Sequence, residues 1–167
     1  MKKELRNKGF SLIELIVIIA IMGVMLAVGG YSLTAISSAN AKQCAKELEA
    51  GLNSTRAESY SSDTSANIAT VSFYKGTDGI YMEKSYEAGA KKIGGSKVTV
   101  SYKLEGSTDY VQLDANKLTF SFNRSSAAFR EAKINGSSAM CESIKISSGT
   151  KLYTITCYEH TGKTMLE

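Results

Sequence analysis

The feature that most constrains the fold of this chain is a 19-residue apolar run from Phe10 to Val28. Its only clearly polar members are Ser11 and Glu14. As a helix, the run would be about 29 Å long, close to the roughly 30 Å hydrocarbon core of a bilayer. The run therefore predicts a membrane-spanning helix over residues 10–30. A carboxylate in such a segment costs roughly 2.5–3.5 kcal/mol, so Glu14 needs a functional explanation.

Basic residues are concentrated just before this run. Residues 1–9 contain four Lys or Arg and one Glu, so they carry most of the formal net charge of +4. Positive charge beside a membrane span stays cytoplasmic, which predicts that the C-terminal part of the chain lies outside. Because the rest of the chain is nearly neutral, we predict no specific nucleic-acid partner.

The helical pattern continues beyond the apolar run. Small or apolar residues recur at spacings near three, four, seven or eight, as in the face of an amphipathic helix. They are Leu33, Ile36, Ala41, Cys44, Ala45, Leu48, Leu52 and Thr55. This periodicity predicts one helix from about residue 10 to residue 60, of which residues 31–60 are amphipathic.

Short alternating segments separated by turn residues fill residues 61–167 and predict six or seven strands. Residues 110–113 and 117–122, on either side of Asp114-Ala115-Asn116, are interpreted as one hairpin, and the last two strands as another. The predicted fold class is α+β, with the long N-terminal helix packed on an antiparallel β-sheet head domain. The predicted strands are 66–74, 79–83, 97–104, 110–113, 117–122, 140–146 and 151–158.

Three cysteines are too few for a disulfide-stapled scaffold. Cys141 and Cys157 lie at the outer ends of the last predicted hairpin. A three-residue loop between these strands would place them opposite each other, which makes them candidates for a cross-strand disulfide. A shift of register by one residue spoils that pairing, and three free thiols are the alternative. Cys44 lies on the apolar stripe and is interpreted as a packing residue.

Residues suited to catalysis are scarce. His160 is the only histidine, so the sequence offers no histidine-based metal cluster, and we interpret it as a surface side chain. We predict no metal, no cofactor and no enzymatic activity. The aromatic residues alternate within strands and are assigned to the sheet core or to subunit contacts rather than to a base-stacking platform.

The segment Lys8-Gly9-Phe10-Ser11-Leu12-Ile13-Glu14 resembles the N-terminus of type IV pilins and pseudopilins. The resemblance implies that a prepilin peptidase cleaves between Gly9 and Phe10, removing residues 1–9 as a leader, and methylates the new amine of Phe10. The mature subunit would wait in the inner membrane, N-terminus towards the cytoplasm. An assembly platform would then add it to an extracytoplasmic or cell-surface filament with other pilin subunits.

The resemblance also implies a role for Glu14 in assembly, because its carboxylate can pair with the amine of Phe10 in an apolar filament core. Either the amine of the same chain or that of the next subunit is the partner. A Glu14 that only reaches the interface of a membrane anchor is the alternative.

Three other functions stay open. The chain has no proline where many major pilins have one, and its C-terminal part is similar to H-type minor pseudopilins. Both features favour a minor pseudopilin of a type II secretion or DNA-uptake system. A membrane-anchored surface binding protein that never polymerises is a second alternative. A secreted enzyme whose signal peptide is cut near Ala41 is a third.

Overall fold

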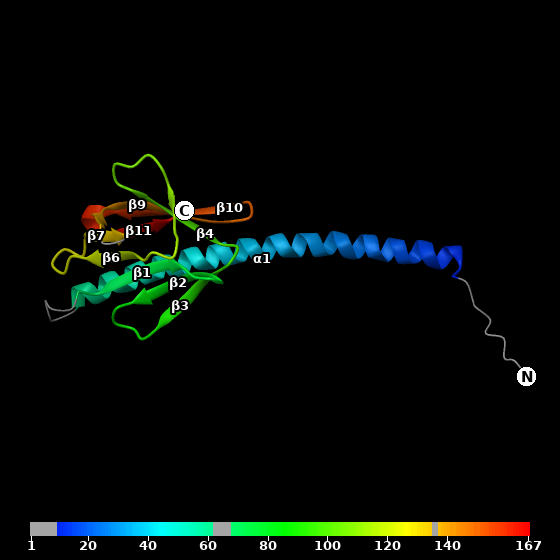
Figure 1. Cartoon of the computed structure of the whole chain (residues 1–167), viewed down its shortest axis with the longest axis horizontal. Coiled ribbons are helices and arrows are strands. Elements are labelled where there is room, and N and C mark those ends of the chain that lie inside the picture. The colour runs from blue at the N-terminus through cyan, green and yellow to red at the C-terminus, as the bar shows by residue number, and fades with distance from the viewer. Residues whose placement is uncertain (1–9, 62–67, 135–136) are drawn as a thin grey trace, which may run out of the picture. The chain divides into compact units, whose positions relative to one another are not determined.

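The computed structural model describes residues 10–61, 68–134 and 137–167, and only the helical backbone of residues 28–37. Its first element is helix α1, Leu12–Ser61, which has 50 residues (Figure 1). This confirms the single long helix that the periodicity predicts. The chain divides into two compact units between Ile36 and Ser37. Within the described residues, no helix combines the length and the apolar character needed to cross a membrane.

The described part of the second unit contains two antiparallel sheets. The six-stranded sheet has the order β3-β2-β1-β6-β7-β8, and the five-stranded sheet has the order β11-β10-β9-β4-β5. A short 3-10 helix, Glu159–Thr161, connects β10 to β11. The strands are β1 (Thr70–Lys75), β2 (Gly79–Lys84), β3 (Ala90–Gly95), β4 (Thr99–Leu104), β5 (Val111–Gln112), β6 (Leu118–Phe122), β7 (Phe129–Ile134), β8 (Ser137–Ala139), β9 (Cys141–Ser148), β10 (Lys151–Tyr158) and β11 (Lys163–Leu166).

The helix followed by antiparallel strands confirms the α+β class, but the strands are divided between two sheets rather than forming one. The hairpin β9–β10 pairs as predicted, and β1 pairs with β2. The predicted hairpin of residues 110–113 with 117–122 is wrong. β5 pairs with β4, whereas β6 pairs with β1 and β7. The amide of Leu113 donates to Val100 O and that of Lys75 to Asp114 O, so this connection passes from one sheet to the other.

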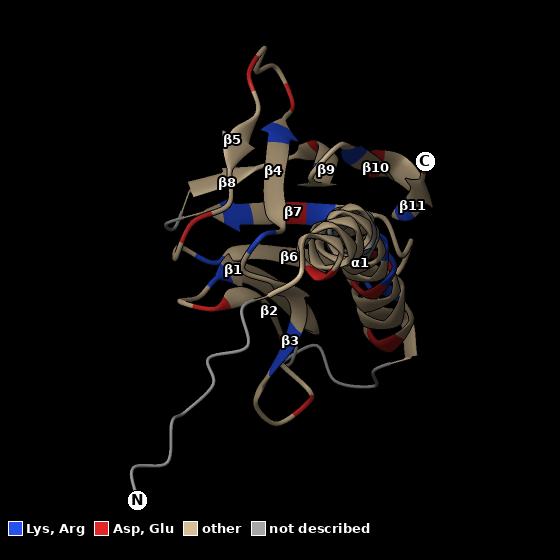
Figure 2. Cartoon of the chain, turned by 90° about the vertical axis from the view of Figure 1, so that its right-hand side faces the viewer, with Lys and Arg blue, Asp and Glu red and all other residues tan. Residues whose placement is uncertain are grey.

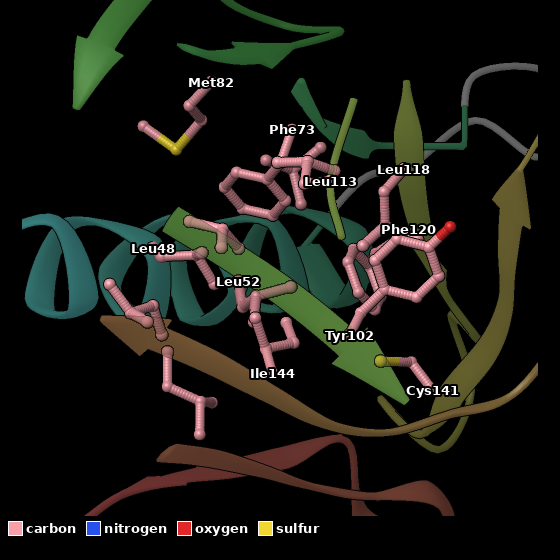
Figure 3. Packing of buried hydrophobic residues seen from close by; sticks show 14 of the residues in the cluster. Leu48, Leu52, Phe73, Met82, Tyr102, Leu113, Leu118, Phe120, Cys141 and Ile144 are labelled. Atoms are coloured by element: carbon pink, nitrogen blue, oxygen red, sulfur yellow. The ribbon is translucent and has the colours of Figure 1, made fainter. Parts of the chain in front are cut away.

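The core lies where the second half of α1 meets both sheets (Figure 3). Leu48 and Leu52 are fully buried and belong to one cluster with Phe73 of the six-stranded sheet and Ile144 of the five-stranded sheet. Six members of the predicted stripe are fully buried, while the side chains of Leu33 and Ile36 lie outside the described residues. The six are Ala41, Cys44, Ala45, Leu48, Leu52 and Thr55.

The regular alternation of β4 explains why the sequence predicts it well. On the face that the alternation defines, Val98, Val100 and Tyr102 are buried and Leu104 is half-buried. The sequences of β3, β7, β8 and β11 lack such an alternation of apolar and polar residues. In β3, for example, only the adjacent residues Ile93 and Gly94 are buried. Lys and Arg are distributed over strands of both sheets rather than gathered on one element (Figure 2).

Candidate processing and assembly site

The first turn of α1 is closed by two reciprocal hydrogen bonds between Ser11 and the residues that follow it. The amide of Ile13 donates to Ser11 Oγ over 3.2 Å, and the amide of Ser11 donates to Glu14 Oε2 over 2.9 Å. This is a capping-box arrangement, in which a Ser N-cap and a Glu at the third helical position satisfy backbone amides at the helix start. The carboxylate also lies near the positive end of the helix dipole.

Glu14 therefore has a structural partner in its own chain before any processing. The hydrogen bond to the Ser11 amide occupies one position on one carboxylate oxygen. A carboxylate offers about four lone-pair sites, so this bond leaves capacity for a second donor such as an ammonium group. Phe10, whose amine cleavage would create, directly precedes the N-cap and is 80% exposed. Gly9, on the other side of the predicted cleavage point, lies outside the described residues.

The apolar side chains that follow the capping box are exposed on every side of the helix. The large aliphatic residues and methionines from Leu12 to Leu26 are between 43% and 78% exposed. Burying such a side chain stabilises a protein by roughly 1.5–3 kcal/mol relative to leaving it in water. This first half of the helix is therefore an extensive apolar surface that requires an apolar environment.

The predicted cysteine pair is brought together by a mechanism that the sequence did not indicate. Lys151 pairs with Ser148, so the β9–β10 turn consists of Gly149 and Thr150 rather than a three-residue loop. Gly149 has a φ of 62°, a left-handed conformation that glycine adopts without strain. In this register Cys157 would face Glu142, so the prediction that it directly faces Cys141 is wrong by one residue.

A β-bulge compensates for this shift. Along β4, Lys103 pairs with Ser143 and the next residue, Leu104, pairs with Cys141, which leaves Glu142 as an extra residue in β9. Glu142 is exposed, whereas Cys141 and Cys157 are each only 8% exposed and belong to the core cluster. Hydrogen bonding to Cys157, together with burial, raises the pKa of the Cys141 thiol. All three cysteines are free thiols in this structure.

The remaining candidates for chemistry do not form a site in the described part of the chain. His160 is exposed. No group of three or more His, Cys, Asp or Glu among the described residues is arranged to hold a metal ion. The rings of Tyr74 and Tyr81 stack on the surface of the six-stranded sheet, with 5.6 Å between their centroids. The ammonium group of Lys117 also lies over the ring of Tyr74, so this pair is packed within its own sheet.

Two functional details were therefore missed in the sequence. The capping box was readable, because Ser11-Leu12-Ile13-Glu14 has the Ser-x-x-Glu spacing immediately before an apolar run. The bulge at Glu142 was not readable, since local sequence does not show where two residues of one strand lie opposite a single residue of its partner.

Comparison with known proteins supports the assignment of this N-terminal site. Residues 5–30 match the prokaryotic N-terminal methylation motif. No curated protein and no solved structure matches the chain. The motif is the signature of type IV prepilins, and it covers the last five residues of the predicted leader, the capping box and the apolar part of the helix. It supports a pilin-like or pseudopilin substrate of prepilin peptidase and implies assembly with other pilin subunits.

Proposed function

We propose that this chain is a prepilin that becomes a structural subunit of a type IV pilus-like filament. Prepilin peptidase cleaves it after Gly9 and methylates Phe10, and the mature chain catalyses no reaction. The observation that carries the proposal is the methylation motif at residues 5–30, joined to a helix whose apolar side chains are exposed on every side. A bundle of such helices buries that surface without changing the fold of the head.

Before assembly, the same surface needs the apolar interior of a membrane. The 19-residue apolar run and the four basic residues before it support an anchor in the inner membrane with a cytoplasmic N-terminus. This orientation places the scissile bond on the cytoplasmic side and the β-sheet head outside. Extraction into a filament then exchanges lipid contacts for contacts with neighbouring helices.

Glu14 links processing to assembly. Cleavage creates an ammonium group on Phe10 that the precursor lacks, and in a filament core this cation pairs with the carboxylate of Glu14 on a neighbouring subunit. The capping box supports the intersubunit pairing because it already supplies Glu14 with a donor from its own chain. A buried ion pair adds little net stability, but leaving either charge unpaired is costly, so the pair selects one axial register.

The mature N-terminus provides the first test. Mass spectrometry of the protein recovered from cells that express a prepilin peptidase should identify a peptide that begins at Phe10 and carries a methyl group on its amine. A mature chain that begins near Ala41 would contradict the proposal and support a secreted protein with an ordinary signal peptide.

The Glu14→Gln variant tests assembly separately from processing. It should still lose its leader and retain a folded head, but its incorporation into filaments should fall at least tenfold, since an unpaired buried ammonium costs several kcal/mol. Glu58→Gln is the matched control, because Glu58 is an exposed carboxylate on the same helix. Unchanged function of the Glu14 variant in the absence of any filament would support the anchor-only alternative.

A minor pseudopilin is the second candidate. The chain has no proline, and helix α1 is continuous from Leu12 to Ser61. Quantifying the copies of this chain in purified native filaments distinguishes the two roles. The chain is a major subunit if it accounts for most of the filament mass, and a minor one if it is present in traces.

A further inference from the structure

We propose that Cys141 and Cys157 form an oxidisable dithiol site, which small disulfide reagents convert into a cross-strand disulfide and which favours cationic over anionic reagents. This inference does not depend on the filament role, because it rests only on the described geometry of the five-stranded sheet. The structure shows the reduced form of the site.

The first argument is the placement of the two thiols. The bulge at Glu142 moves Cys141 into the core position that a regular strand would give to Glu142, beside Cys157 on β10. Both side chains line the same pocket, and Cys141 Sγ lies 3.7 Å from Ser143 O. Bulges commonly redirect a side chain, and here the result is a pair of adjacent thiols on neighbouring strands.

The second argument is access. A pocket of about 170 Å³ reaches both cysteines, so these thiols are not enclosed like that of Cys44, which is fully buried in the core. Methionine and glutamate side chains form the rest of its wall. The lining residues are Glu105, Met140, Cys141, Glu142, Cys157 and Glu159. A small reagent can enter such a space and form the mixed disulfide through which exchange proceeds.

The third argument is charge. Three of the six lining residues are glutamates, and only Glu142 has a described ion pair, with Lys103 Nζ at 2.8 Å. Carboxylates around a narrow opening raise the local concentration of cations and lower that of anions, an effect that salt screens. The raised pKa of Cys141 keeps that thiol protonated near neutral pH. The exchange with a disulfide reagent is therefore slow near neutral pH and accelerates as pH rises, and its rate depends on the charge of the reagent.

The chemistry is a two-step exchange. One cysteine loses its proton to solvent, and its thiolate attacks the reagent's disulfide, releasing the first thiol and leaving a mixed disulfide. The second cysteine loses its proton and attacks the protein-bound sulfur, which releases the second thiol. Two protein thiols are thus oxidised to one disulfide, and the reagent's disulfide is reduced to two thiols.

The test uses the folded, full-length chain in detergent, incubated at low salt with either cystamine, a dication, or glutathione disulfide, an anion. The intact mass should fall by about 2 Da, and tryptic digestion should yield one disulfide-linked pair of peptides that contain Cys141 and Cys157. Cystamine should react about tenfold faster at low salt, and high salt should remove most of that difference. Oxidation should raise the melting temperature by about 10 °C. The bridge would close a loop of about 15 residues and so reduce the conformational entropy of the unfolded chain.

Two variants complete the test. Cys44→Ser should form the same bridge, because Cys44 lies elsewhere in the core, whereas Glu105→Gln combined with Glu159→Gln should remove most of the preference for cystamine. A stable mixed disulfide on one cysteine, a bridge that includes Cys44, or no oxidation of the folded chain would each overturn the dithiol site. Equal rates for the two reagents at low salt would overturn the charge preference.

Discussion

The two halves of helix α1 have similar backbones and opposite surroundings. From Leu12 to Leu26 the apolar side chains are exposed on every side. From Ala41 to Thr55 the apolar residues form one stripe that is fully buried by the two sheets, and most charged residues lie away from it. The second half therefore obtains its stability within the chain, whereas the first half leaves apolar surface that only an apolar environment would bury. This contrast is expected of a subunit that folds first and assembles later.

The largest expected effect comes from truncating one leucine in each half. Leu52→Ala should lower the free energy of unfolding of the head by about 2–5 kcal/mol, because it leaves a cavity in the core. Leu15→Ala should change it by less than about 0.5 kcal/mol, because Leu15 is exposed. Urea unfolding followed by circular dichroism provides the measurement. Similar losses for both variants would show that the first half also supports the head.

Alkaline pH should destabilise the head domain, in which the second half of the helix is buried. Burial, with a smaller contribution from Glu47, raises the pKa of Cys44 to about 12. Between pH 9 and pH 12 the unfolded chain releases the thiol proton while the folded chain retains it. The free energy of unfolding therefore falls as pH rises, by up to about 1.4 kcal/mol per pH unit from this group.

Cys44→Ala should reduce this alkaline slope without abolishing it, because folding also raises the pKa of the Cys141 thiol. Ser59→Ala is the control, since Ser59 is buried in the same helix but does not titrate in this range. Urea midpoints measured at intervals from pH 8 to pH 11 give the slopes. If the Cys44 variant kept the wild-type slope, the thiol would not be protected by the core.

Replacing one glycine in each half with alanine should give a smaller contrast in the stability of the head. A Cβ at Gly51 would collide with Met82 Sδ in the core, whereas a Cβ at Gly23 meets open space. Gly51→Ala should therefore cost about 1 kcal/mol of head stability after the gain in helix propensity is deducted. Gly23→Ala should leave head stability unchanged and should increase helical content. Thermal melts and far-UV circular dichroism of the two variants would separate these results.

The smallest effect concerns the helix start. Ser11→Ala removes the N-cap and should weaken the first turn by about 1 kcal/mol, which increases hydrogen exchange of the Ile13 and Leu15 amides about fivefold. Ser11→Asp should retain most of the protection, because Asp is also a strong N-cap. Mass-spectrometric exchange on the full chain in detergent measures both variants. Equal exchange in wild type and Ser11→Ala would mean that the capping box does not hold the first turn.

Local periodicity was sufficient to predict the elements that repeat regularly. The long helix, its buried stripe and strand β4 each show one pattern over many residues. The sequences of strands β3, β7, β8 and β11 lack that repetition, so these strands were missed. The link between residues 110–113 and 117–122 was misinterpreted as a hairpin turn because a turn and a crossing between sheets use the same polar residues.

The candidate site was predictable to a similar degree. Gly9, Phe10 and Glu14 are recognisable because they form a contiguous motif, and the capping box follows from the Ser-x-x-Glu spacing. The position of Cys141 beside Cys157 required the structure, since it depends on a bulge that β9 makes against β4.

The sequence alone determined the processing motif, the long helix and the division of that helix into an apolar and an amphipathic half. These are local properties, because helix periodicity and contiguous motifs depend on residues a few positions apart. The tertiary structure decided the two-sheet arrangement, the Ile144–Ile155 register and the placement of Cys141 and Cys157 around one pocket. These depend on strands that are far apart in the sequence, whose pairing minimises the free energy of the whole core rather than that of any one segment.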